Sequence, residues 1–239
     1  MIYLKRGAVF VLGVFVITAV VLAVKLVTDK FYVQEIVVSG NYRIDREDVI
    51  KSSRLRRGDP LMGLRFSDVD KNLRENAWIK KVSLRKQFPG TFFIALEEAV
   101  PTALLNIEKG LFIVDNEGKL LERITGESTT FLPVIKGIEP ENKKGLGEAL
   151  KLVDALSAKN VFAGRDTVEI GLEPYGLAMH VEGEFIKVGY GNYPEKFKRW
   201  MELEPEIRKR GLELEYVDLR FKDSVIVKPA GEAAKESTS

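Results

Sequence analysis

Residues 77–104 read AWIKKVSLRKQFPGTFFIALEEAVPTAL, and this stretch decides the fold of the segment around it. Apolar and polar side chains alternate along Ile79–Gln87, a pattern that predicts a strand with one buried face. Phe88-Pro89-Gly90 predicts a turn. Thr91–Glu98 is rich in aromatic and apolar residues and predicts a second strand. The stretch therefore contains two strands joined by a short turn.

Upstream of this stretch, the sequence predicts one further strand and two helices. Tyr32–Ser39 is rich in β-branched residues and predicts the strand. Asp45 and Ser67 each have an aspartate three positions later, which predicts that they are the N-caps of two helices. The order from residue 31 to residue 100 is thus β-α-α-β-β, which is the size of a small α+β module.

Residues 101–229 predict a second α+β domain. A hairpin is expected over Leu111–Leu121, and helical periodicity covers Glu148–Ala158 and Pro194–Arg210. Pro205 predicts a kink or a restart within the last helix. The remaining apolar runs predict strands that form an antiparallel sheet under the helices: Val168–Gly171, Leu177–Glu182, Glu184–Tyr190, Leu214–Phe221 and Val225–Lys228.

The N-terminal segment has a different composition from the rest of the chain. Residues 7–24 carry no charge over 18 positions, which at about 1.5 Å per residue is close to the hydrocarbon thickness of a bilayer. We therefore expect a membrane helix over residues 7–28. A cleavable signal peptide is the competing interpretation, but the run exceeds the usual apolar core of about 7–15 residues. Flanking Lys and Arg residues are balanced, so charge does not decide the orientation.

Composition excludes several classes of function. The chain has 37 Lys and Arg against 35 Asp and Glu, whereas a dedicated nucleic-acid binder carries a large basic excess. With no cysteine and one histidine, the chain cannot build a thiol nucleophile or a multi-histidine metal site. His180 would share a strand face with Glu182 and Glu184 only if the strand continued through Gly183, and a hairpin turn is favoured there. We therefore predict no catalytic residue, no metal site and no cofactor.

One region is locally basic. Between Arg43 and Lys86 there are 13 basic and seven acidic residues. This excess fits a surface for anionic lipid or an acidic partner, and it also fits an ordinary solvated face.

Several of these motifs together resemble the FtsQ/DivIB family of bacterial division proteins. The matching features are the Trp78-Ile79 pair, the Phe88-Pro89 turn, Glu98 three residues before Pro101, and the closing run Tyr216–Phe221. The resemblance implies an α+β chain with one transmembrane helix, a POTRA module and a β-domain. The expected organisation is a cytoplasmic tail (1–6), a transmembrane helix (7–28), a POTRA domain (31–100), a β-domain (101–229) and a flexible tail (230–239).

The resemblance also implies a function and a place in the cell. Such a protein is a non-enzymatic scaffold of the divisome, anchored in the inner membrane at the septum, with a cytoplasmic N-terminus and an extracytoplasmic bulk. Its partners would be FtsB/FtsL-type division proteins, together with membrane lipid and other divisome proteins. The alternatives are a POTRA-bearing component of an outer-membrane assembly or secretion system, and a membrane-anchored enzyme.

The implied partner site lies at the C-terminal end of the β-domain. There the last strand would receive a strand of the FtsB-type partner by β-strand addition. Arg220 and Phe221 match the basic-aromatic pair of the family, and Ser224–Val227 is the candidate edge. A proline at Ile226 would remove an edge donor if that N–H points outward. The predicted partner-binding residues are Tyr216, Leu219, Arg220, Phe221, Ser224, Val225, Ile226 and Val227.

Overall fold

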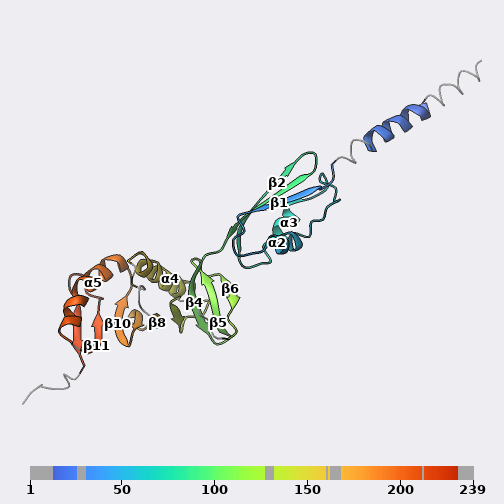
Figure 1. Cartoon of the computed structure of the whole chain (residues 1–239). Helices are drawn as coiled ribbons and strands as arrows, with labels where there is room; N and C mark the ends of the chain where they lie inside the picture. The colour runs from blue at the N-terminus through green and yellow to red at the C-terminus, as the bar shows by residue number, and fades with distance from the viewer. Residues whose placement is uncertain are drawn as a thin grey trace, which may run out of the picture. The chain divides into compact units, whose positions relative to one another are not determined.

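The computed structural model describes residues 13–25, 31–126, 132–159, 161, 168–211 and 213–230 (Figure 1). The chain divides into two compact units, Met1–Ala99 and Val100–Ser239. The expected tail 1–6, both ends of the expected membrane segment, and residues 231–239 lie outside the described residues. Residues 13–25 form a helix. Within the described ranges, no helix combines the length and the apolar character needed to cross a membrane.

The first unit contains the predicted β-α-α-β-β order. Its elements are β1 (Glu35–Ser39), α2 (Arg46–Ser53), α3 (Phe66–Leu73), β2 (Ile79–Gln87) and β3 (Thr91–Glu98). The sheet order is β1-β3-β2, with β1 parallel to β3 and β2 antiparallel to it. Alternation along β2 and β3 places one face of the sheet in the core. There Phe92 and Ile94 of β3 form one cluster with Val49 of α2 and Leu73 of α3.

The two predicted helix starts have different outcomes. Asp45 precedes α2 as expected, although its side chain makes no capping hydrogen bond. The prediction for Ser67 is wrong, because α3 begins one residue earlier at Phe66 and Arg65 is the residue before it. Arg65 instead contacts the first turn of the helix, where its Nε donates to Asp68 at 2.9 Å.

The second unit is a nine-stranded sheet with two helices. Its strand order is β12-β11-β10-β9-β8-β7-β4-β5-β6. The strands are β4 (Pro101–Ile107), β5 (Gly110–Asp115), β6 (Leu120–Arg123), β7 (Val134–Lys136), β8 (Val168–Glu173), β9 (Gly176–Val181), β10 (Glu184–Gly189), β11 (Leu214–Asp218) and β12 (Ile226–Pro229). The helices are α4 (Lys143–Ala158) and α5 (Tyr193–Lys209), which lie along one side of the sheet in Figure 1.

The expectation of an antiparallel sheet in this unit is wrong. The pairs β4–β7, β7–β8 and β10–β11 are parallel, so the sheet is mixed. For the pairs β7–β8 and β10–β11 the reason is the position of the helices in the chain, because α4 joins β7 to β8 and α5 joins β10 to β11. A helix that crosses over a sheet returns the chain in the same direction, which makes the flanking strands parallel.

The core of this unit lies between the sheet and the helices. Trp200 and Phe197 of α5 pack edge to face, with ring centroids 6.3 Å apart, and both are buried. They share one cluster with α4 and strand side chains, including Leu152, Leu156 and Ile170. Helix α5 continues through Pro205, so this proline does not restart the helix. A proline has no N–H to donate to the carbonyl one helical turn earlier. Because Pro205 is exposed, water can hydrogen-bond that carbonyl instead.

Candidate partner-binding edge

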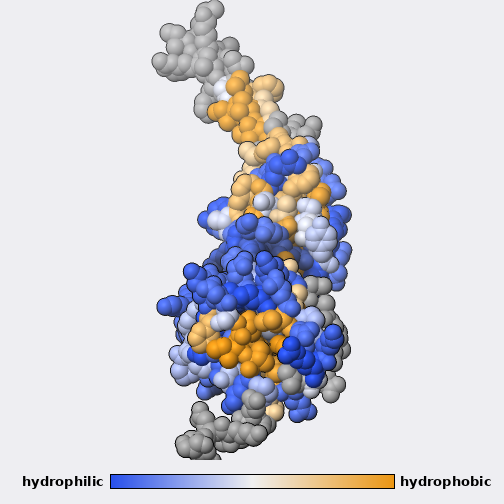
Figure 2. All heavy atoms as spheres, turned by 90° about the vertical axis from the view of Figure 1, so that its left-hand side faces the viewer, coloured by the Kyte–Doolittle hydropathy of each residue, from blue (hydrophilic) through white to orange (hydrophobic). Residues whose placement is uncertain are grey.

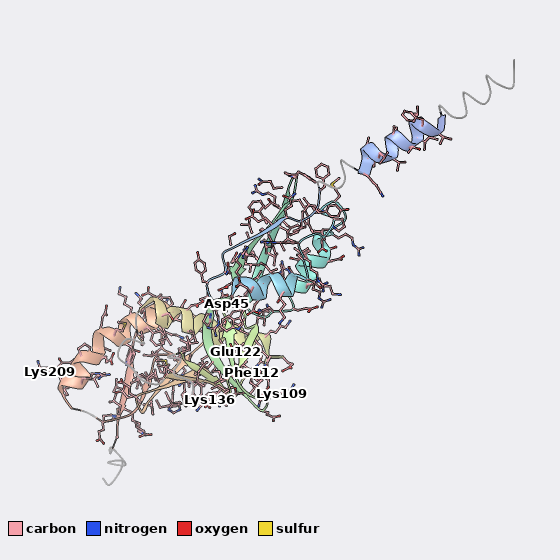
Figure 3. All side chains as sticks on the ribbon, turned by 45° about the vertical axis from the view of Figure 1, so that its right-hand side comes forward. Asp45, Lys109, Phe112, Glu122, Lys136 and Lys209 are labelled. Carbon is pink, nitrogen blue, oxygen red and sulfur yellow. The ribbon has the colours of Figure 1, made fainter. Side chains whose placement is uncertain are left out.

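The last strand of the chain, β12, forms one edge of the nine-stranded sheet, and β6 forms the other. β12 pairs with β11 in antiparallel register, with Ile226 opposite Asp218 and Lys228 opposite Tyr216. Figure 3 shows the two ends of this unit through Lys209, at the end of α5, and Glu122, on β6. An edge strand keeps one row of backbone groups free of strand partners, and such a row can pair with a strand of another protein.

Two hydrogen bonds decide which backbone groups of β12 face the open side. Along a strand, the N–H and C=O of one residue point to one side and those of the next residue to the other. The N–H of Leu219 donates to the carbonyl of Lys187 in β10 at 2.8 Å, so Asp218 and Tyr216 direct their backbone groups toward β12. At the other end, the N–H of Ala230 donates to the carbonyl of Glu213 at 2.7 Å.

The open side of β12 is consequently defined by Val227 and Pro229. Ile226 and Lys228 lie opposite Asp218 and Tyr216, and their backbone groups face β11. The backbone N–H and C=O of Val227 face outward. Pro229 belongs to the strand rather than ending it, and at an outward position it has no donor to lose. A proline at Ile226 would therefore not remove an edge donor, because the backbone N–H of Ile226 points inward, toward β11.

The predicted site residues fall into different environments. Leu219 is fully buried in the core, so its side chain is not on the surface of the edge. Val225 precedes β12 and packs against the same core, whereas Ser224 is exposed. Phe221 and Ile226 are exposed apolar side chains. Figure 2 shows an apolar patch, in orange, on the side of this unit that carries α5 and β11 in Figure 1.

Arg220 is held by a nearly buried carboxylate. Its Nε lies 2.9 Å and its Nη2 2.6 Å from the two oxygens of Asp218, and its guanidinium lies 4.6 Å from the ring centre of Tyr175. Burial acts to raise the pKa of the Asp218 carboxyl, but the side-chain and backbone hydrogen bonds of Arg220, with the charge of Lys187, outweigh it and lower that pKa. The Arg220 side chain is therefore fixed at the surface rather than free to rotate.

The depressed pKa predicts a specific loss of stability in acid. A carboxylate whose folded pKa lies below its unfolded value stabilises the protein above the unfolded value of about 3.9, and this contribution disappears as pH falls through the folded pKa. We expect Asp218→Asn to lower the free energy of unfolding at neutral pH by roughly 1–3 kcal/mol. The gap to the wild type should narrow as pH falls through the folded pKa of the Asp218 carboxyl, in urea titrations at graded pH. Glu215→Gln, which removes an exposed partner of Lys228, is the control. A gap that persists in acid would contradict the assignment.

Tyr216 lies between two lysines on the same side of the sheet as Arg220. Lys187 Nζ is 3.6 Å and Lys228 Nζ is 5.7 Å from the ring centre of Tyr216. Lys228 also pairs with Glu215 at 2.8 Å. Cations over aromatic faces hold both groups in defined positions. The edge thus presents basic and aromatic side chains beside the backbone of Val227, which faces away from β11.

Arg199 of α5 holds the turn between β11 and β12, a role that sequence reasoning missed. Its guanidinium donates to the carbonyls of Phe221, at 3.0 Å, and Lys222. These contacts span more than twenty residues of sequence, so no local spacing could indicate them. Lys187 and Tyr175 were missed for the same reason, since their contacts with Tyr216 and Arg220 depend on strand pairing.

The alternative metal interpretation finds no geometric support. His180 lies in β9 and its ring packs against Phe185 of β10, with centroids 4.8 Å apart. Glu182 and Gly183 form the turn between these strands, so the predicted hairpin is confirmed. Among the residues that the structure describes, no three metal-ligating side chains lie close enough together to hold an ion.

Comparison with known proteins identifies both units. Residues 31–99 match the FtsQ-type POTRA domain, and residues 103–220 match the C-terminal domain of the cell division protein FtsQ/DivIB. The chain is similar to the cell division protein FtsQ of Geobacter sp. (strain M21), with 31% identity over 82% of this chain and 75% of the relative. It is also similar to FtsQ of Geotalea daltonii, with 29% identity over 84% of this chain and 77% of the relative. The resemblance found in the sequence is confirmed: the chain belongs to the FtsQ/DivIB family of non-enzymatic cell division proteins.

Proposed function

We propose that this protein is a membrane-anchored scaffold of the divisome that receives a strand of an FtsB/FtsL-type partner along β12. The observation that carries the proposal is the open edge, where no strand among the described residues pairs with the outer side of Val227. An incoming strand would extend the nine-stranded sheet by one. Four residues offer few backbone bonds, so neighbouring side chains contribute much of the affinity.

The side chains beside the edge favour a partner strand with both apolar and acidic residues. Ile226 and Phe221 offer exposed apolar surface. Lys228 and Arg220 each pair with a carboxylate of this chain, Glu215 and Asp218, but an ammonium and a guanidinium have more N–H donors than one such pair uses. Apolar contacts supply affinity, whereas charge complementarity accelerates association and selects the partner. An apolar segment with flanking carboxylates fits this surface.

The proposed organisation adds a membrane anchor before the POTRA domain and the β-domain. We place the anchor at 7–28 and the tail 1–6 in the cytoplasm. The remaining segments lie outside the cytoplasm: the POTRA domain (31–100), the β-domain (101–229) and the tail (230–239). The uncharged run over residues 7–24 supports the anchor, because its length suits a bilayer. Family membership supports action at the division septum, next to other divisome proteins.

Photo-crosslinking from the two sheet edges tests the proposed interface. A benzophenone amino acid replaces either Ile226, on β12, or Glu122, on the opposite edge strand β6. With the full-length chain and the FtsB/FtsL-type pair in membranes, we expect crosslinks from position 226 and none above background from position 122, because only one edge receives the partner strand. Equal crosslinking from both positions, or crosslinking from 122 alone, would overturn the proposal.

A further inference from the structure

Three segments of the first unit meet at the end of the sheet where the chain enters β1. The N–H of Leu61 donates to the carbonyl of Phe31 at 2.9 Å, and the N–H of Val33 donates to the carbonyl of Asp59 at 2.8 Å. The N–H of Gln34 donates to the carbonyl of Gly90 at 2.8 Å, which adds the β2–β3 turn. Figure 1 shows this turn and the beginning of β1 at the same end of the sheet. We call residues 31–34, 56–66 and 86–90 the entry tip.

The entry tip exposes four large apolar side chains. Met62 is 69% exposed, Phe88 51%, Phe66 45% and Tyr32 37%. The rings are supported from below rather than loose: Phe88 packs edge to face on Phe31 at 5.4 Å, and Phe66 packs on Phe92 at 5.9 Å. Single exposed apolar residues are ordinary, but a group of them on one small surface marks a contact site.

Basic side chains accompany this apolar surface. The entry tip contains Arg56, Arg57, Arg65 and Lys86 against a single carboxylate, Asp59. Asp59 accepts the backbone N–H of Arg56 at 2.7 Å, and Arg65 pairs with Asp68 just outside the tip. Lys86 lies 5.1 Å from the ring centre of Phe66 and donates to the carbonyl of Leu64. Aromatic and Met side chains with Lys and Arg around them are the composition of surfaces that enter the headgroup region of a bilayer.

The chain itself brings this surface close to a membrane. Six residue steps separate Lys25, in the N-terminal helix, from Phe31, at the start of the tip. Even fully extended, that length spans only about 21 Å. We infer that the entry tip binds the anionic lipid surface of the bilayer, with Met62 and Phe88 at the headgroup level and Arg56 and Arg57 on the lipid phosphates. This inference rests on the proposed anchor at residues 7–28.

Site-directed labelling in vesicles tests the lipid contact without any partner protein. The chain has no cysteine, so a single cysteine takes a fluorescent label at one chosen position. The full-length Met62→Cys variant is compared with the Tyr42→Cys variant. The native Tyr42 side chain is 96% exposed and follows the far end of β1. The protein is reconstituted into vesicles of phosphatidylcholine and phosphatidylglycerol that contain a doxyl-labelled lipid quencher. We expect strong quenching at position 62 and little at position 42.

The role of charge is tested with the same label at position 62. A basic residue near an anionic leaflet changes partitioning by roughly fivefold, so Arg56→Gln with Arg57→Gln should weaken the contact about 25-fold and abolish the quenching. Vesicles of phosphatidylcholine alone should have the same effect. Equal quenching at positions 62 and 42 would overturn the inference. The basic surface would then be a binding site for an acidic protein partner instead.

A third label separates this inference from the proposed anchor. Val16 lies in the uncharged run, so a label on the Val16→Cys variant reports whether that run enters the bilayer. Quenching at 16 but not at 62 overturns the lipid contact and leaves the anchor intact. If neither position is quenched, the anchor and the lipid contact both fail.

Discussion

Substitution of Val227 by proline is expected to weaken capture of the FtsB/FtsL-type partner by about tenfold or more while the protein stays folded. The backbone N–H of Val227 faces the open side of β12, so proline removes the donor that an incoming strand would use. An acceptor left unpaired in the new strand costs about 1–3 kcal/mol, and the affinity should fall by about tenfold or more. The pyrrolidine ring also occupies space where the partner backbone would lie.

The matched control for this substitution is Val227→Ala. Alanine removes the same side-chain packing but keeps the N–H, so the difference between the two variants isolates the backbone donor. Binding is measured by titration of the partner pair against full-length protein in detergent or nanodiscs, and circular dichroism checks the fold. If Val227→Pro and Val227→Ala bind equally well, strand addition at β12 is wrong.

Truncation of Trp200 to alanine should have the largest effect on stability. The indole is fully buried between α5 and the sheet, where it packs on Phe197. Removal of a buried tryptophan leaves a cavity and costs about 3–5 kcal/mol, which is a large share of the roughly 5–15 kcal/mol that stabilises a domain. Urea unfolding followed by circular dichroism measures the loss.

The neighbouring residue on the same helix supplies the control for Trp200. Met201 is exposed, and Met201→Ala should change the free energy of unfolding by no more than about 0.5 kcal/mol. Trp78 lies in the core of the first unit and remains the only tryptophan of the Trp200→Ala variant, so its fluorescence follows that unit separately. A cost near that of Met201→Ala would mean that Trp200 is not a core residue.

The local pattern predicts the first unit well because its signals are short in range. Strands β2 and β3 have the bounds that alternation and the Phe88-Pro89-Gly90 turn predict. Helix α4 is less well predicted, since it begins five residues before the expected start at Glu148. Asn142 accounts for the difference, because its side chain accepts the N–H of Gly145 at 3.0 Å and caps the helix there. Strand β4 has no predicted counterpart at all.

Some features of the candidate edge can also be predicted from the sequence, whereas others depend on contacts in the folded protein. The sequence alone indicates the family, the β-α-α-β-β order of the first unit and the presence of a short terminal strand, because these depend on side-chain periodicity and motif order. Tertiary contacts alone show that Leu219 is buried, that Val227 rather than Ile226 faces outward, and that Arg199 holds the turn. The physical reason is that strand direction and register depend on pairing between residues far apart in the chain, and a shift of one residue reverses which backbone groups face the open side.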